Sequence, residues 1–252
     1  MSINTVEIGQ PDRPPVVFAH GWARTHADFM PIAELIAHTA RVILLDLPGF
    51  GESPRPDTDW DTNDYADHVH THLQHNCGID RFIWVGHSFG GRVGLRLAAL
   101  RDTPVDALVL VAGAGVRTPP PLLKKIRGRW KSRQFQKLKS NAHSEEELIE
   151  LERQFGSPDY VQSRELGLRD IFIKTIQEDQ SESAKAITCP TTLIYGAKDS
   201  ETPPAEGRIL NAAIRGSCYV ECPEYDHHSI LTRGRHQVAL ALKEAIAQRD
   251  DA

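Results

Sequence analysis

A serine flanked by glycines, in the pentapeptide G-x-S-x-G at residues 86–90, stands between an apolar run and a helix-forming segment. The apolar run at 82–85 predicts a buried strand, and residues 92–100 predict a helix. The glycines permit a strained strand-to-helix corner that projects the Ser88 hydroxyl away from the sheet. The N-terminus of the next helix offers free backbone N–H groups, which suit a developing oxyanion. The pentapeptide therefore predicts an α/β fold with a nucleophilic serine, provided that a base and an acid occur elsewhere.

Strand-like and helix-like segments alternate along most of the chain, which predicts a mostly parallel central sheet with helices on both faces. The segment before Val16 is short, so we expect one edge strand to be missing. The expected strands cover residues 16–19, 41–45, 82–85, 107–111, 191–195 and 217–221. The expected helices cover residues 28–38, 63–76, 92–100 and 237–247.

The alternation stops between Val116 and Ile187, where the chain becomes polar and helical after three prolines at 119–121. Ligands in open α/β sheets bind at the carboxyl edge of the strands. We therefore interpret this segment as a helical cap over that edge, inserted before the last two strands. The predicted division is an α/β core of residues 1–116 and 188–252 and a cap of residues 117–187.

The first part of the predicted cap is strongly basic. Residues 117–140 contain nine Lys or Arg and no Asp or Glu, and a run rich in glutamate follows at 145–152. One interpretation is a solvated helix pair with complementary charges. The other is a basic surface that docks an acidic carrier protein or an anionic substrate. The basic residues are Arg117, Lys124, Lys125, Arg127, Arg129, Lys131, Arg133, Lys137 and Lys139.

Composition excludes several classes of protein. A net charge of −5 argues against general nucleic-acid binding, and no apolar stretch reaches membrane-spanning length. The N-terminus has neither the basic nor the apolar region of a secretory signal. The four cysteines form no C-x-x-C pair, and the histidines show no metal-ligand spacing. We expect a cytoplasmic protein with reduced thiols, no cofactor and no metal site.

A serine hydroxyl needs a base that is itself oriented by a third group. The candidate acid is Asp199, in a loop just beyond the expected strand 191–195 and so at the same sheet edge as Ser88. Glu201 is a weaker candidate, and the loop at 112–115 offers no carboxylate. The candidate bases are His227 and His228, which follow the last expected strand.

Two backbone N–H groups are needed for an oxyanion. Phe89 follows the serine and supplies one, and Trp22 follows the expected strand 16–19 and supplies the other. The side chains of Trp22 and His87 are expected to line the substrate pocket. His20 is expected to shape the oxyanion loop, and Asp46 to anchor a tight loop without a catalytic role.

Taken in order, these motifs resemble the α/β-hydrolase superfamily, in its branch with a serine nucleophile. The matching segments are His20-Gly21-Trp22, Asp46 to Ser53, Gly86 to Gly91, Gly196 to Asp199 and Asp226-His227. Within the superfamily the chain is similar to small carboxylesterases, which include the pimeloyl-carrier-protein methyl ester esterases. The resemblance implies a Ser88–Asp199–His227 triad and hydrolysis of a carboxylic ester or thioester through an acyl-enzyme.

Other readings of the resemblance stay open. The doubled histidine departs from the Gly-His of the family, and the family spacing from Pro223 favours His227, with His228 as the alternative base. Gly91-Arg92-Val93 is similar to the menaquinone-pathway synthases, so a lyase, a synthase or a carbon–carbon hydrolase could use the same triad. A ligand receptor with a vestigial triad is the reading without catalysis. Serine at the elbow excludes the dehalogenases and epoxide hydrolases that use aspartate.

Overall fold

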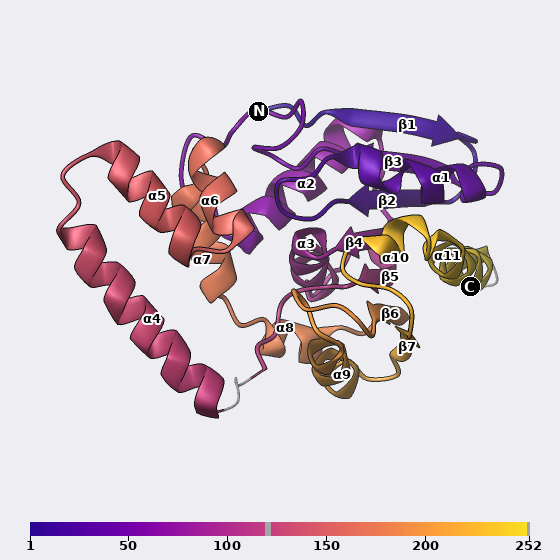
Figure 1. Cartoon of the computed structure of the whole chain (residues 1–252). Coiled ribbons are helices and arrows are strands. Elements are labelled where there is room, and N and C mark those ends of the chain that lie inside the picture. The colour runs from indigo at the N-terminus through magenta and orange to yellow at the C-terminus, as the bar shows by residue number, and fades with distance from the viewer. Residues whose placement is uncertain (119–121, 251–252) are drawn as a thin grey trace.

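The computed structural model describes residues 1–118 and 122–250, in which seven strands form one sheet (Figure 1). The strand order is β1-β3-β2-β4-β5-β6-β7; β1 runs antiparallel to β3, and every other neighbouring pair is parallel. The strands are β1 (Thr5–Gly9), β2 (Pro15–Ala19), β3 (Arg41–Leu45), β4 (Phe82–His87), β5 (Val105–Val111), β6 (Thr191–Gly196) and β7 (Cys218–Cys222). The predicted α/β fold class is confirmed.

Helices cover both faces of this sheet, and each face has its own apolar core (Figure 1). One face is covered by the 3-10 helix η1 (His26–Phe29), α1 (Met30–Ile36), α10 (Ser229–Thr232) and α11 (Arg235–Asp250). The other face is covered by α2 (Thr62–Cys77), α3 (Phe89–Ala98), α8 (Ser181–Ala186) and α9 (Pro204–Ala213).

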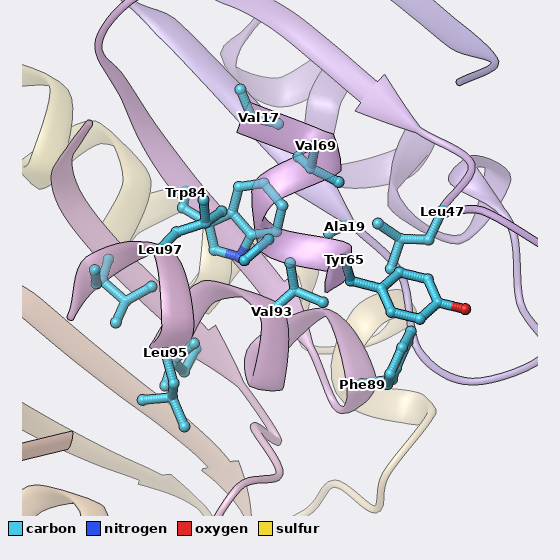
Figure 2. Close-up of a cluster of buried hydrophobic side chains, with 14 of the residues drawn as sticks. Val17, Ala19, Leu47, Tyr65, Val69, Trp84, Phe89, Val93, Leu95 and Leu97 are labelled. Atoms are coloured by element: carbon cyan, nitrogen blue, oxygen red, sulfur yellow. The ribbon is translucent and has the colours of Figure 1, made fainter. Parts of the chain in front are cut away.

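Successive side chains of a strand point to opposite faces of the sheet, so each strand contributes residues to both cores. On β2, Val16 and Phe18 belong to the core under α1 and α11, whereas Val17 belongs to the core under α2 and α3. Figure 2 shows the second core, where the Trp84 indole lies between α2 and α3. Its Nε1–H donates to the carbonyl of Gly90 at 3.0 Å. The corner that follows β4 is therefore tied directly to the buried core.

The remaining helices lie between β5 and β6, where the alternation was predicted to stop. They are α4 (Leu122–Ser140), α5 (Glu145–Phe155), α6 (Pro158–Glu165) and α7 (Arg169–Gln177), followed by α8. Figure 1 shows α4 as a long helix at the margin of the molecule, beside α5 and away from the sheet. The prolines at 119–121 lie outside the described residues. The division of the chain at residues 117 and 187 stays a prediction.

Two features of the fold differ from the expectation. The short segment before Val16 does hold an edge strand, β1, which pairs with β3 from Thr5 to Gly9. The pattern of half-buried and exposed residues on this outer strand gives it little apolar signal. Helix α9, which begins at Pro204, was also not expected. None of the helices in the described residues is long and apolar enough to span a bilayer.

Candidate active site

Ser88 lies at the corner between β4 and α3, with a left-handed backbone (φ 47°, ψ −106°). A non-glycine residue at positive φ is strained, and such strain persists only where its surroundings fix it. Here the Ser88 N–H donates to Val111 at 3.2 Å, and the Ser88 carbonyl accepts from Ala114 at 3.2 Å. The corner is thus held from the neighbouring strand β5 and the loop after it.

The flanking glycines are required because the corner leaves no room for side chains. A Cβ on Gly86 would lie 2.4 Å from the Gly90 carbonyl oxygen, and one on Gly90 would lie 2.0 Å from the Ala19 carbonyl oxygen. Both distances are far inside van der Waals contact. The pentapeptide spacing therefore reflects close backbone packing as well as the strained serine.

Asp199 and His227 are brought together at the carboxyl edge of the sheet. The His227 Nδ1–H donates to Asp199 Oδ2 at 2.8 Å, and both side chains are buried. Asp199 Oδ1 accepts the backbone N–H groups of Glu201 (2.8 Å) and Thr202 (2.9 Å). The Thr202 hydroxyl donates to the Ala112 carbonyl at 2.9 Å, and its oxygen lies 3.1 Å from His227 Nδ1. The carboxylate is thus held in place to orient the imidazole.

The two adjacent histidines have different surroundings. The His228 side chain is 57% exposed and lies 3.7 Å from Glu201, measured from Nε2 to Oε1. Burial lowers the pKa of His227, but the Asp199 hydrogen bond and the charges of Asp199, Glu201 and Asp159 outweigh it, so the pKa is raised above 6.5. Of the two, His227 has the oriented geometry of a base.

His20 and Trp22 lie at the end of β2, beside the corner. Burial lowers the pKa of His20 to about 4, so the ring is neutral. Its Nε2 accepts from the Leu47 N–H at 3.0 Å, which leaves Nδ1–H to donate to the Gly21 carbonyl at 2.7 Å. This pair of bonds fixes the loop that carries Trp22.

The two predicted oxyanion donors fit this role differently. Phe89 is the first residue of α3, where backbone N–H groups have no partner within the helix. In the described residues, the Trp22 N–H makes no backbone hydrogen bond, and the indole Nε1 is buried without a partner. The Trp22 ring packs on Phe50, Phe89 and Phe172. Its side chain therefore joins helix α7 to the corner.

A cavity of about 200 Å³ opens at Ser88. Its wall includes Trp22, Phe89, Glu201 and Thr202. A larger cavity of about 700 Å³ lies beside it, shares Trp22 and Glu201, and is also lined by His228. His87 lines neither cavity: it is fully buried, and its Nε2 lies 2.9 Å from the His227 carbonyl oxygen. The structure therefore places His87 behind these two cavities rather than on their walls.

Four polar residues near Ser88 were not selected from the sequence as members of the site. Thr202 follows Asp199 by three residues, and Arg92 follows Ser88 by four, one helical turn along α3. These spacings could have identified both. Asp159 and Glu206 also line the Ser88 cavity, but they come from α6 and α9, which the sequence did not resolve. The described residues contain no cluster of His, Cys, Asp or Glu with metal-binding geometry.

Comparison with known proteins agrees with the fold. Residues 14–144 match the family model described as the alpha/beta hydrolase fold. The pimeloyl-[acyl-carrier protein] methyl ester esterase of Chromobacterium violaceum is 29% identical over 239 residues, covering 87% of this chain and 89% of that protein.

Two solved structures show the same architecture at lower identity. The enol-lactonase from Burkholderia xenovorans LB400 superposes with a TM-score of 0.74 at 21% identity, covering 97% of this chain and 96% of the other. The esterase EaEST from Exiguobacterium antarcticum gives 0.74 at 22% identity, covering 97% and 95%. At these identities the likeness concerns the fold alone.

Proposed function

Because the chain belongs to the α/β-hydrolase family and is a hydrolase, we propose that it cleaves a carboxylic ester or thioester through an acyl-enzyme on Ser88. The observation that carries this proposal is the strained corner at Ser88, which opens on a cavity shared with Glu201 and Thr202. Those two residues belong to the loop that holds the Asp199–His227 pair. These positions support a proposed site at one edge of the sheet, with Ser88 as the nucleophile, His227 as the base and Asp199 as the orienting acid.

The proposed reaction begins with proton transfer from Ser88 Oγ to His227 Nε2 as Oγ attacks the carbonyl carbon. Asp199 stays ionised, accepts the Nδ1–H bond and stabilises the imidazolium. The backbone N–H groups of Trp22 and Phe89 donate to the oxyanion of the tetrahedral intermediate.

Collapse of this intermediate breaks the bond to the alcohol or thiol, which takes the proton from His227 Nε2. Water then attacks the acyl-enzyme while His227 accepts its proton. The second intermediate collapses, the proton returns to Ser88 Oγ, and the carboxylic acid leaves.

The test combines turnover with direct detection of the acyl-enzyme. Ser88→Ala should fold normally and lose at least about 10³-fold in kcat on a p-nitrophenyl ester. The wild-type protein should react with a fluorophosphonate and give an intact-mass adduct on Ser88 with a slow ester substrate. Turnover without such an adduct would favour elimination by the same triad. A protein that neither turns over nor labels would favour a ligand receptor.

We propose further that the basic helix α4 docks an acidic carrier protein that presents the ester. The described basic side chains of α4 are exposed and form no salt bridge with described residues. The glutamates of α5 that do form ion pairs, Glu145 and Glu152, bind arginines at 164 and 169 instead. Direct charge pairing with α5 is therefore not seen for these α4 residues. The side chains of Lys124, Lys125 and Arg129 lie outside the described set.

Charge reversal separates carrier docking from catalysis. The triple variant Arg127→Glu, Lys131→Glu and Arg133→Glu should raise KM for a carrier-bound ester by about tenfold or more and leave kcat/KM on a free small ester unchanged. Added salt should reduce the difference in KM for the carrier-bound ester between the triple variant and the wild type. Arg101→Glu, an exposed charge reversal on the core, is the control. Equal kinetics of the triple variant and the wild type on the carrier-bound ester would reject docking at α4.

A further inference from the structure

Arg92 is a cation in the Ser88 cavity that the proposed mechanism does not use. It follows Ser88 by four residues on α3, so both side chains project from the same side of the helix into one cavity. A guanidinium carries five N–H donors and stays charged in proteins. The one hydrogen bond that it makes in the described residues is a 3.4 Å contact with the Glu178 carbonyl, and no described carboxylate forms a salt bridge with it.

Arg96, the next arginine on the same helix, has a structural role because its guanidinium donates to several fixed acceptors. Arg96 donates to the hydroxyls of Thr62 (2.9 Å) and Ser183 (3.0 Å) and to the Glu178 carboxylate (3.0 Å). Its donors are occupied by groups of α2, of α8 and of the segment between α7 and α8. Arg92 has no comparable set of acceptors, although burial lowers its pKa and so disfavours its charge. A half-buried guanidinium with free donors is suited to an anionic ligand.

A second arginine and a carboxyl group of raised pKa share the cavity wall with Arg92. Arg117 lines the same cavity, as does Glu206 from α9. Burial raises the pKa of Glu206 to about 7, with Asp199 acting in the same direction and Arg92 against it. Near neutral pH a large fraction of Glu206 is therefore uncharged. The charged and titratable groups that face Glu206 are Arg92, Arg117, Asp199 and Tyr195.

The two ends of the cavity differ in the charges that act on them. The acids that act on His227 are Asp199, Glu201 and Asp159. The charges that act on Arg92 are those of Glu178, Glu206 and the neighbouring arginines. The charges that act on His227 are thus those of carboxylates, whereas Arg92 and Arg117 bring two guanidinium groups to the cavity wall.

This polarity orients a substrate. In the proposed mechanism His227 protonates the leaving group, so the leaving group must lie on the histidine side. The cavity of about 700 Å³ lined by Glu201 and His228 offers space there. The acyl part then extends from Ser88 in the other direction, toward Arg92 and Arg117.

We infer that Arg92, assisted by Arg117, forms a carboxylate subsite, and that the substrate is a half-ester or half-thioester of a dicarboxylic acid. The inference rests on the proposed function, because it takes the attacked carbonyl to lie at Ser88. The guanidinium of Arg92 donates to the free carboxylate of the acyl group, and Glu206 competes with that carboxylate for Arg92 when it is ionised.

The kinetic test uses monomethyl esters of dicarboxylic acids with four to eight carbons and the methyl esters of monocarboxylic acids of equal length. The wild type should prefer at least one half-ester to its neutral counterpart. Arg92→Gln should lower kcat/KM for that half-ester by about tenfold to a hundredfold and change the neutral ester by less than about threefold. Arg101→Gln removes the same charge at an exposed site and should change neither. Equal losses on both esters, or no loss, would overturn the subsite.

A binding test separates this inference from the proposed reaction. The Ser88→Ala protein should bind the matching dicarboxylate in a calorimetric titration, and adding Arg92→Gln should weaken that binding about tenfold or more. If the wild type hydrolyses no ester, the proposed function fails, while this titration still decides the subsite. In the Ser88→Ala background, Glu206→Gln should tighten dicarboxylate binding at pH 8, where wild-type Glu206 is ionised. If Glu206→Gln leaves dicarboxylate binding at pH 8 unchanged or weakens it, the inference is overturned. This result decides the question even if Arg92→Gln does not fold.

Discussion

His87, the residue before Ser88, is hydrogen-bonded to the backbone carbonyl of His227, the proposed base. Its Nε2 lies 2.9 Å from the His227 carbonyl oxygen, and the two rings lie 4.6 Å apart between centroids. Burial and the nearby His227 hold the pKa of His87 well below 6.5. The neutral ring therefore carries its proton on Nε2 and donates it to the carbonyl. The corner at Ser88 and the loop of the base are connected behind the cavity.

Removing this connection should affect the rate more than substrate binding. We expect His87→Ala to lower kcat about tenfold with little change in KM, since the base becomes less well placed. The variant should also lose about 2 kcal/mol of unfolding free energy, because a buried carbonyl loses its donor and a cavity remains. Steady-state kinetics and urea denaturation measure both effects, and His236→Ala, at an exposed site, is the control. A rise in KM with unchanged kcat would point to a pocket role instead.

Gly90 should tolerate no side chain. The new Cβ in Gly90→Ala would lie 2.0 Å from the Ala19 carbonyl oxygen, and the neighbouring atoms are backbone atoms that cannot rotate away. We expect a loss of at least about 3 kcal/mol in unfolding free energy, together with loss of fluorophosphonate labelling. Gly216→Ala is the comparison, because nothing lies within 4 Å of its Cβ, and its positive φ alone should cost about 1 kcal/mol. Similar losses in the two variants would contradict the close packing of the corner.

The pH dependence of kcat/KM should report the protonation of His227. The base acts only when neutral, and its pKa is raised above 6.5, so activity should fall as the pH decreases through a midpoint above 6.5. Glu201 Oε2 lies 3.6 Å from His227 Nε2 and favours the protonated ring. Glu201→Gln should therefore move the midpoint to lower pH, and Glu224→Gln, which removes an exposed carboxylate elsewhere, should not. A midpoint that stays in place or moves to higher pH in Glu201→Gln would exclude this effect of Glu201.

The sequence predicted the parallel strands of the core well because each is a short apolar run followed by a glycine or a polar turn. Strand β1 was missed because Thr5–Gly9 is half exposed and pairs at the edge of the sheet. Spacing from Pro223 favoured His227 over His228, but the burial of the His227 ring against Asp199 depends on tertiary packing and could not be predicted from the sequence. Asp159 and Glu206 could not be found either, because helices from distant parts of the chain bring them to Ser88. Local patterns thus identify strands and corners, whereas the charged wall of the cavity depends on tertiary packing.

Helices α5, α6 and α7 should be stabilised by Glu152 of α5, a carboxylate that is only 2% exposed. It accepts two hydrogen bonds from Arg164 and two from Arg169, and so joins α5 to α6 and α7. The Arg169 Cζ atom also lies 3.5 Å from the centre of the Tyr160 ring.

Removing the Glu152 carboxylate leaves two arginines without their shared acceptor, so we expect Glu152→Ala to destabilise the packing of α5, α6 and α7 by about 2 kcal/mol. Amide hydrogen exchange should quicken across α5, α6 and α7 and stay unchanged in β4 and β5. Glu150→Ala, on the exposed side of α5, should leave exchange unchanged throughout. Faster exchange in the central strands of Glu152→Ala would show that these three helices and the sheet unfold as one unit.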